Sequence, residues 1–292
     1  MIIYRFLILY NFLYNYNTFN NLNFNFLKKN KHIIISKVIF KGEKCLKIKL
    51  STQTVKKSDF QVAKEILKPD IVVLSEIKEL DNLLGGFKSG EVTYIDGDSD
   101  LIQKIPNQIC VNTYRSFRND IVYIDGGMSA DPYKIAKYAK KIELNQKELL
   151  EHIHISRAFT VYQLTTQIQE MLEQAIKRYH PQTLIINRFP ILYLDSDVET
   201  KEAKALLRSN IHKIKELTKK YDLITVFTNL DKELLSHNRN INKILYHNVD
   251  EIVLIKQDEH ATFIELLNKK KKTIIPNLVK GQARLSDFWM VI

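Results

Sequence analysis

Residues 85–104, GGFKSGEVTYIDGDSDLIQK, decide the fold, because a short apolar strand ends at Gly97 and a helix-like stretch follows it. A strand, a glycine and a helix in this order frame a phosphate-binding loop, whose working pattern is G-x-x-x-x-G-K-[ST]. Counted from Gly97, the second glycine is replaced by Ile102, the lysine by Gln103 and the hydroxyl residue by Lys104. The sequence therefore predicts the scaffold of a nucleotide site without the residues that bind phosphate.

The bulk composition is that of a soluble globular protein. Of the 292 residues, 45% are hydrophobic and 26% are charged. A chain of this length can hold one large domain with an ample core and a smaller appendage. The two cysteines, Cys45 and Cys110, exclude a disulfide framework and indicate a reducing compartment, so we expect a cytoplasmic protein.

The net charge of +11 is concentrated near the amino terminus. Residues 1–70 hold 13 Lys and Arg against 4 Asp and Glu, which leaves the rest of the chain almost neutral. A basic arm on a neutral body suits attraction to an anionic polymer or surface. A solvated lysine-rich segment explains the same charge equally well, so charge alone does not choose between the two.

The first 32 residues are of low complexity, and we expect them to be disordered or to follow a misassigned translation start. Their apolar run is interrupted by Arg5 and Asn11 and is too short to span a membrane. It also lacks the small-residue cleavage site of a signal peptide. Association with a membrane surface is an alternative for this segment, but we expect no membrane partner.

From residue 69 onward, strands and amphipathic helices alternate, which predicts an α/β domain with a largely parallel sheet. Apolar residues recur every three or four positions in residues 161–179 and 200–220, and these stripes predict helices with one face in the core. The last strands follow one another closely, which predicts antiparallel members at the end of the sheet. The expected strands are residues 91–96, 121–125, 183–187, 223–228, 251–256 and 262–267. Residues 33–68 form a small extension, with two strands around Lys41-Gly42 and a short helix over 58–68.

An ordered series of segments resembles the ATPase core of the RecA/RadA recombinase superfamily. SEIKELDNLLGGFKSGEVTYIDGD resembles the entry to that core, and IVYIDGGMSADPYKIAKYA its second strand and following helix. ISRAFTVYQLTTQI, TLIINRF, LITVFTNL and IIPNLVKGQARLS follow in the family's order as a pre-helix segment, the metal-binding strand, the sensor strand and the closing hairpin. The resemblance covers residues 69–288 and is nearest to archaeal RadA/RadB-like paralogues. The helix-hairpin-helix domain of full-length RadA is not recognisable in residues 33–68.

The resemblance implies a fold and a function. The fold is a RecA-like P-loop core over residues 69–292, with a mostly parallel twisted sheet flanked by helices. The implied role is DNA recombination or repair. Family members assemble edge to edge, so pairing with a second copy or with an ATP-competent paralogue is expected.

Four parts of the implied ATP site depart from the family pattern. The phosphate loop has lost its lysine and its magnesium-binding hydroxyl, and the catalytic glutamate two positions after Asp125 is Gly127. Asn187 stands where the metal-binding aspartate is expected, and Leu230 replaces the glutamine sensor. Losing a single such group can slow phosphoryl transfer by roughly 10³-fold or more, so we expect a pseudo-ATPase without catalytic residues. Weak ATP binding stays open. The remnant of the site comprises Gly97, Asp98, Ser99, Lys104, Asp125 and Asn187.

The sequence offers two sets of candidate DNA-binding residues. By the resemblance, the loops facing DNA are residues 190–202, which are acidic, and residues 231–248, which carry Lys232, Arg239 and Lys243. The second set is the lysine run Lys269, Lys270, Lys271 and Lys272, which can neutralise phosphates or can be a solvated hairpin tip.

The carboxyl terminus carries a Q-x-x-L-x-x-aromatic-aromatic pattern, made by Gln282, Leu285, Phe288 and Trp289. This pattern resembles the peptide by which replication and repair proteins dock on the sliding clamp. A helical turn would place Leu285 and the aromatics on one face as interface anchors. The alternative, which we favour, is that GQARLS forms the last core strand.

We therefore expect an accessory recombinase paralogue that binds DNA, an active paralogue, or both. One alternative is an active DNA-dependent ATPase with a remodelled loop in which Lys104 and Asp125 support turnover. Another is a KaiC-like scaffold that binds proteins rather than DNA. The histidines show no metal-ligand spacing, so no metal site is expected.

Overall fold

The computed structural model describes residues 23–24, 35–41, 44–50, 71–230 and 239–277. The chain divides into two compact units, Met1–Pro69 and Asp70–Ile292. In the first unit, β1 (Asn23–Phe24), β2 (Ile35–Lys41) and β3 (Lys44–Leu50) pair in antiparallel fashion. β2 and β3 confirm the two strands predicted around Lys41-Gly42, while the helix predicted over 58–68 lies outside the described residues.

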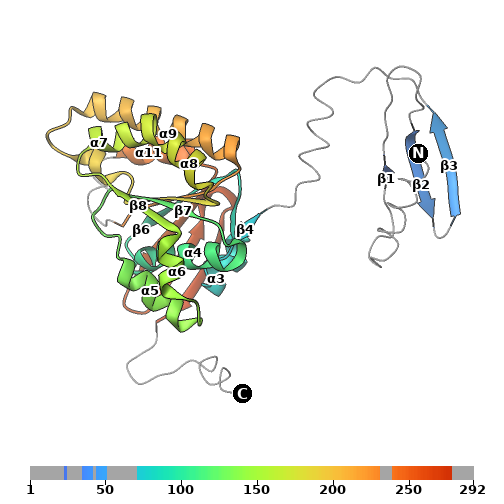
Figure 1. The fold of residues 1–292 in the computed structure, drawn as a ribbon, viewed down its shortest axis with the longest axis horizontal. Coiled ribbons are helices and arrows are strands. Elements are labelled where there is room, and N and C mark those ends of the chain that lie inside the picture. Colours follow the sequence, from blue (N-terminus) through green and yellow to red (C-terminus); the bar gives the residue numbers. More distant parts are fainter. Residues whose placement is uncertain (1–22, 25–34, 42–43, 51–70, 231–238, 278–292) are drawn as a thin grey trace. The chain divides into compact units, whose positions relative to one another are not determined.

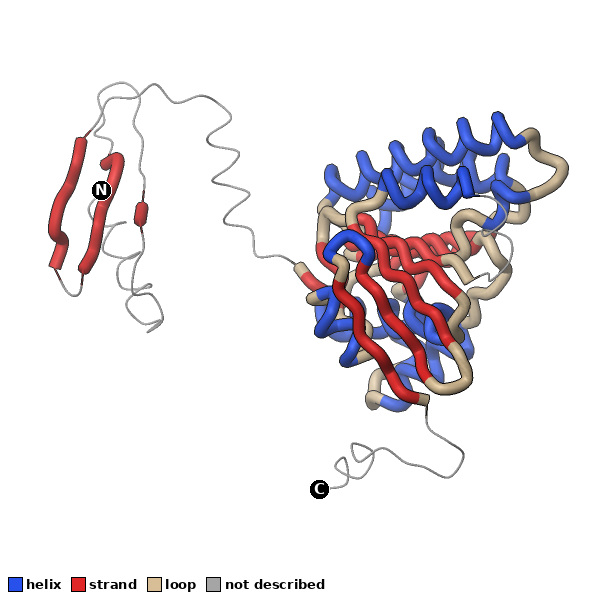
Figure 2. The backbone as a smooth tube through the Cα atoms, turned by 180° about the vertical axis from the view of Figure 1, so that it is seen from behind, coloured by secondary structure: helices blue, strands red, loops and turns tan. Residues whose placement is uncertain are grey.

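The second unit is built on an eight-stranded sheet with the order β13-β12-β11-β6-β10-β9-β7-β8. The six strands from β11 to β8 are parallel, and β12 and β13 are antiparallel, as the close spacing of the last strands predicted. The strands are β6 (Val92–Gly97), β7 (Ile121–Asp125), β8 (Ile153–Arg157), β9 (Thr183–Asn187), β10 (Ile224–Thr228), β11 (Glu251–Gln257), β12 (Ala261–Leu266) and β13 (Lys271–Pro276). Figure 2 shows this sheet from behind. A separate two-stranded sheet pairs β4 (Val72–Val73) with β5 (Phe87–Lys88).

Helices cover both faces of the sheet (Figure 1). α3 (Lys78–Leu84), α4 (Leu101–Phe117), α5 (Pro132–Lys141) and α6 (Gln146–Glu151) pack on one face. α7 (Val161–Thr166), α8 (Leu172–Tyr179), α9 (Thr200–Tyr221) and α11 (Arg239–Asn248) pack on the other. Because both faces are covered, every residue of β7, β9 and β10 is buried, which explains why these strands are mainly apolar and carry no exposed polar face. The predicted α/β architecture is confirmed.

The apolar stripe of α9 lies in the core as predicted. Ala203, Leu207, Ile211, Ile214 and Leu217 are all buried against the sheet. Their spacing of three or four residues places them on one side of the helix and leaves the opposite side to solvent.

The single helix predicted over residues 161–179 is interrupted by a π-helical turn. This turn, Gln167–Met171, separates α7 from α8. It adds one residue to the local repeat, so Ile176 is buried where the sequence predicted Ala175, which is only half-buried. The prediction of one regular helix was therefore wrong at this point.

Short 3-10 helices, Ile191–Leu194 and Leu267–Lys269, complete the described elements. Within the ranges that the structure describes, no helix is both long and apolar enough to cross a membrane.

Candidate functional site

The predicted remnant residues meet at the carboxyl edge of the parallel strands. β6 ends at Gly97, β7 at Asp125, β9 at Asn187 and β10 at Thr228. Parallel strands direct their carboxyl ends to the same edge, and ligands of open α/β sheets bind in the crevice at this edge. The fold thus brings together Gly97, Asp125 and Asn187, which are separated by up to 90 positions.

The connection between β6 and α4 is only three residues long, Asp98 to Asp100. The working phosphate loop has four residues between its two glycines, and here the helix begins at the fourth of these positions, Leu101. The Leu101 backbone N–H donates to Ser99 Oγ at 3.2 Å, and the Ile102 N–H donates to the Ser99 carbonyl at 3.0 Å. The N–H groups that open α4 therefore bind the preceding turn. In a working loop they would cradle a phosphate.

The same connection is tied to β11. The Asp98 N–H donates to the Ile255 carbonyl at 3.0 Å, and Asp98 Oδ1 accepts the Gln257 N–H at 2.8 Å. The buried Ser99 hydroxyl hydrogen-bonds Gln257 Oε1 at 2.9 Å. Three polar groups of the connection thus have partners on β11 that a phosphate would have to displace.

Gly97 has a packing role against β11. Its φ of +141° lies in the region that favours glycine, and a Cβ at this position would lie 1.8 Å from the Ile255 carbonyl oxygen. The neighbouring Asp96 is buried beneath the loop, where its carboxylate accepts Asn229 Nδ2 at 2.8 Å and the Tyr246 hydroxyl at 2.7 Å. Burial and the adjacent Asp96 carboxylate raise the pKa of Tyr246, so its phenol stays protonated as a donor.

Neither Ile102 nor Lys104, both at positions of the phosphate-loop pattern, is placed to bind a phosphate. Ile102, at the position of the second loop glycine, is 1% exposed and belongs to the core beneath the sheet. Lys104 is exposed on α4 and does not line the adjacent cavity. The structure therefore does not bring Lys104 together with Asp125 and Asn187.

The Asp125 carboxylate is fully buried and is bound by the protein itself. Oδ1 accepts the Gly127 N–H and Asn187 Nδ2, both at 3.2 Å, and Oδ2 accepts the Ala130 N–H at 2.8 Å. Arg157 Nε lies 3.9 Å from Oδ2 and forms an ion pair with it. These partners satisfy the carboxylate and hold the loop after β7 against β9.

Asn187 is equally engaged. Its Nδ2 also donates to Ser129 Oγ at 2.6 Å, and its Oδ1 accepts the Thr228 hydroxyl at 2.7 Å. An amide can both donate and accept, whereas the aspartate implied at this position could only accept. Asn187 therefore links three strand ends in a closed hydrogen-bond network.

Arg188 occupies the space next to Gly127, where the resemblance implies a catalytic glutamate. A Cβ on Gly127 would lie 2.2 Å from Arg188 Cδ and 2.8 Å from Arg188 Cβ. Arg188 is held in place because its Nη2 donates to the Leu230 carbonyl at 2.5 Å. A larger residue at position 127 would need Arg188 to move.

A cavity of about 70 Å³ opens between these elements. Small-molecule sites usually measure about 300–1,000 Å³, so this space suits water rather than a nucleotide. Burial raises the pKa of the Tyr123 phenol, which lines it, well above the usual range. The lining residues are Ile102, Gln103, Asn107, Tyr123, Ser129, Lys134, Asn187, Arg188, Thr228 and Leu230.

Sequence reasoning missed Arg157, Arg188 and Ser129, which complete this network. Arg188 directly follows Asn187 at the strand end, and this adjacency was the one signal that could have indicated it. Ser129 and Arg157 come from two other loops, and their roles depend on the tertiary contacts given above.

The described candidate DNA-binding residues come from two elements of the fold, α11 and the β12–β13 hairpin. Lys243 is exposed on α11, which begins at Arg239. Lys269 and Lys270 lie in the connection between β12 and β13, and Lys271 and Lys272 begin β13. Lys269 Nζ forms an ion pair with Glu251 at 2.5 Å. Lys232 and the clamp-docking candidates Gln282, Leu285, Phe288 and Trp289 lie outside the described residues.

Two histidines flank one carboxylate at the opposite edge of the sheet. His152 Nδ1 and His154 Nε2 lie 2.5 and 2.7 Å from the two oxygens of Asp120, and His154 stacks on Tyr179. Among the residues of known placement, no group of three or more His, Cys, Asp or Glu side chains has the arrangement of a metal site.

Comparison with known proteins gives one family. A family model described as Rad51 matches residues 68–243, which is more than half of the chain. No curated protein matches the chain.

Proposed function

The chain belongs to the Rad51 family of RecA/RadA-type recombinases, and on this premise we propose that it is an accessory subunit that does not hydrolyse ATP. The family match confirms the superfamily resemblance and the RecA-like core predicted from the sequence. It supports a role in DNA recombination or repair. The accessory role and the loss of hydrolysis are the content of our proposal.

The observation that carries the proposal is the three-residue connection between β6 and α4. Its amides and side chains bind Ser99, Ile255 and Gln257, and Ile102 fills the place of a glycine. A bound triphosphate needs free N–H groups and close approach of the backbone. Creating them here would require the loop to leave β11 and Ile102 to leave the core.

The second support is the chemistry of the strand ends. Asp125 accepts three hydrogen bonds from the protein, Asn187 offers no negative charge, and Arg188 fills the space beside Gly127. Phosphoryl transfer depends on a metal ion, a base or a positioned water, and cations on the phosphates. The cations that line the cavity, Lys134 and Arg188, are engaged with Asp131 and with the Leu230 carbonyl, and the exposed Lys104 does not line it.

The proposed partners are DNA and either a second copy or an ATP-competent paralogue. Proteins of this family bind DNA and often form oligomers or paralogue complexes. A subunit that lacks hydrolysis can contribute DNA contacts and an assembly surface, while an active paralogue supplies turnover. Docking on a sliding clamp through the carboxyl-terminal pattern is a further proposal that rests on the sequence.

The test measures ATP and DNA binding by the purified full-length chain. We expect no magnesium-dependent phosphate release, with or without DNA, and no saturable binding of a fluorescent ATP analogue at micromolar concentration. We expect DNA binding whose affinity falls steeply with salt and is unchanged by ATP.

Phosphate release that is abolished by Lys104→Ala would contradict the pseudo-ATPase proposal and favour a remodelled active site. Absence of DNA binding at low salt, together with a stable protein partner, would instead favour a scaffold that binds proteins. Ser116→Ala, a change at an exposed residue of α4 that does not line the cavity, is the matched control for nonspecific damage to α4.

A further inference from the structure

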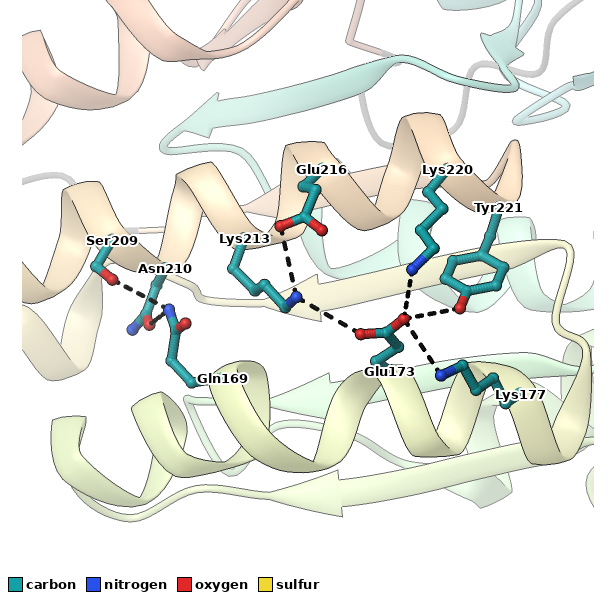
Figure 3. A network of polar contacts seen from close by, with 9 residues as sticks. All are labelled: Gln169, Glu173, Lys177, Ser209, Asn210, Lys213, Glu216, Lys220 and Tyr221. Atoms are coloured by element: carbon teal, nitrogen blue, oxygen red, sulfur yellow. Dashed lines mark hydrogen bonds and ion pairs between the residues drawn. The ribbon is translucent and has the colours of Figure 1, made fainter.

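α9 carries basic side chains in two rows with different surroundings. The inner row, Lys213 and Lys220, faces α8, where Glu173 binds both (Figure 3). Glu173 also accepts the Tyr221 hydroxyl and pairs with Lys177. Hydrogen bonds from Lys220 and Tyr221 lower the pKa of Glu173 to about 2, so it is ionised at neutral pH and neutralises this row.

The outer row lies on the solvent side of the same helix. At 3.6 residues per turn, its members fall within an arc of about 80° and extend over about 27 Å. The arc borders one edge of the buried stripe, next to Ile211 and Thr218, and its side chains are exposed or half-buried. The outer row consists of Lys201, Lys204, Arg208, His212, Lys215 and Lys219.

Most of the outer row has no acidic partner. Lys215 pairs with Asp250 at 3.0 Å. Lys201, Lys204, Arg208 and Lys219 form no hydrogen bond or ion pair with any residue whose position is described. The remaining acids of α9 do not reach them, because Glu216 pairs with Lys213, and Glu202 hydrogen-bonds Tyr162. Within the part of the chain that the structure describes, four positive charges of this face therefore lack an acidic partner.

The neighbouring helix extends this positive surface. α11 packs beside α9 on the same face of the sheet and exposes Lys243, one of the residues predicted from the sequence to bind DNA. In Figure 1, α9 runs along the top of the α/β unit. Lys201, Arg208, His212 and Lys219 are exposed, and Lys204 and Lys215 are half-buried.

The chemistry of this face favours nucleic acid over a membrane or a protein. Membrane-binding helices need exposed apolar residues next to their lysines, and protein interfaces are anchored by buried aromatic or aliphatic side chains. The exposed large hydrophobic residues of the described chain lie on other elements, and none lies on α9 or on residues 241–248 of α11. The row is about 27 Å long, which corresponds to about eight base-pair steps of 3.4 Å along the axis of a DNA duplex.

We propose that the outer row of α9, with Lys243 of α11, binds the phosphate backbone of double-stranded DNA. The inference rests on the proposed DNA-binding function and identifies a surface distinct from the carboxyl edge of the sheet. Each lysine or arginine that neutralises a phosphate releases a counterion, which makes the binding salt-dependent and independent of base sequence. The contact positions duplex DNA along the helix and reads no bases.

The test is fluorescence anisotropy with a labelled 20-base-pair duplex and the full-length chain at several salt concentrations. The variant Lys204→Gln/Arg208→Gln/Lys219→Gln removes three charges from the outer row. We expect the DNA affinity at low salt to fall about tenfold or more. Each lost phosphate contact makes the slope of log K against log salt shallower by about 0.9, so the loss of three contacts should change the slope by about 2.7.

The matched control, Lys137→Gln/Lys140→Gln/Lys141→Gln, removes three exposed charges from α5 on the opposite face of the sheet. It should change affinity less than twofold. If the wild type binds DNA and both variants lose the same affinity, or the outer-row variant loses none, the inference is overturned. The DNA-binding function would stand in either case. Failure of the wild type to bind DNA would refute the proposed function and this inference together. Loss of binding to phosphatidylserine vesicles without loss of DNA binding would assign the surface to lipid and also overturn the inference.

Discussion

Replacing Gly97 by alanine tests whether this glycine serves packing rather than phosphate binding. The alanine Cβ would lie 1.8 Å from the carbonyl oxygen and 2.7 Å from the carbonyl carbon of Ile255. Both atoms belong to the backbone of β11, which is hydrogen-bonded to β6 in the centre of the sheet. They cannot yield as a flexible side chain would, so the two strands must separate.

The magnitude follows from two separate costs. Holding a residue with a side chain at the φ of Gly97 costs about 1–3 kcal/mol, and inserting a methyl group into a packed interior costs about 1–3 kcal/mol more. Their sum, roughly 4 kcal/mol, is a large part of the 5–15 kcal/mol that holds a typical domain folded. For a unit of this size it lowers the melting temperature by about 8–16 °C.

Gly85 provides the matched control, because it has a φ of +81° but no atom within 4 Å of a Cβ added to it. Gly85→Ala should therefore cost only the backbone strain, about 1–2 kcal/mol. The assay is urea denaturation of both variants and the wild type, followed by fluorescence. Equal destabilisation by the two substitutions would refute the packing argument, as would a stable Gly97→Ala variant.

Three further predictions concern other parts of the molecule. Glu173→Gln should make the free energy of unfolding fall less steeply as the pH is lowered below 4.5. The folded-state pKa of Glu173, about 2, lies below its ordinary value of 4.5. Its contribution to the free energy of unfolding is therefore present above pH 4.5 and is lost as the pH falls toward 2. Equal pH dependence of the free energy of unfolding for variant and wild type would contradict this. Asn210→Ala should lower the free energy of unfolding by about 2–3 kcal/mol, since it leaves the buried Tyr193 hydroxyl without its partner; a change below about 0.5 kcal/mol in urea denaturation would count against that contact. Asn187→Asp should cost about 2 kcal/mol at pH 7 and less at pH 4, because it places a second carboxylate against Asp125; phosphate release by this variant would argue that a single change restores the site.

Local sequence patterns predicted most of the secondary structure. The apolar runs of β7, β9 and β10 and the stripe of α9 appear where they were expected, because burial on one or both faces leaves a periodic signal in the sequence. The π turn between α7 and α8 was not predicted. In this turn Gln169 hydrogen-bonds Ser209 and Asn210 of α9, and such contacts between helices leave no periodic signal in the sequence (Figure 3).

The candidate site was only partly predictable. The positions of Gly97, Asp125 and Asn187 followed from the ordered resemblance, since each ends a strand of the parallel sheet. Arg188 was not predicted, because its role depends on the space beside Gly127, which comes from a different strand. The positive surface of α9 was also not predicted. Ion pairs with other helices distinguish its outer row from its inner row, and the sequence does not show these pairs.

The sequence by itself determined the family, the order of strands and helices, and the absence of the lysine, the hydroxyl residue and the glutamate expected at an ATP site. These are properties of residue types at local spacings, so they are legible without coordinates. The tertiary structure decided what fills the vacated positions. Ser99 binds Gln257, 158 positions away in the chain, and the Asp125 carboxylate is bound by Asn187, 62 positions away. Such pairings depend on which strand ends meet at the edge of the sheet, because hydrogen bonds form between neighbours in space.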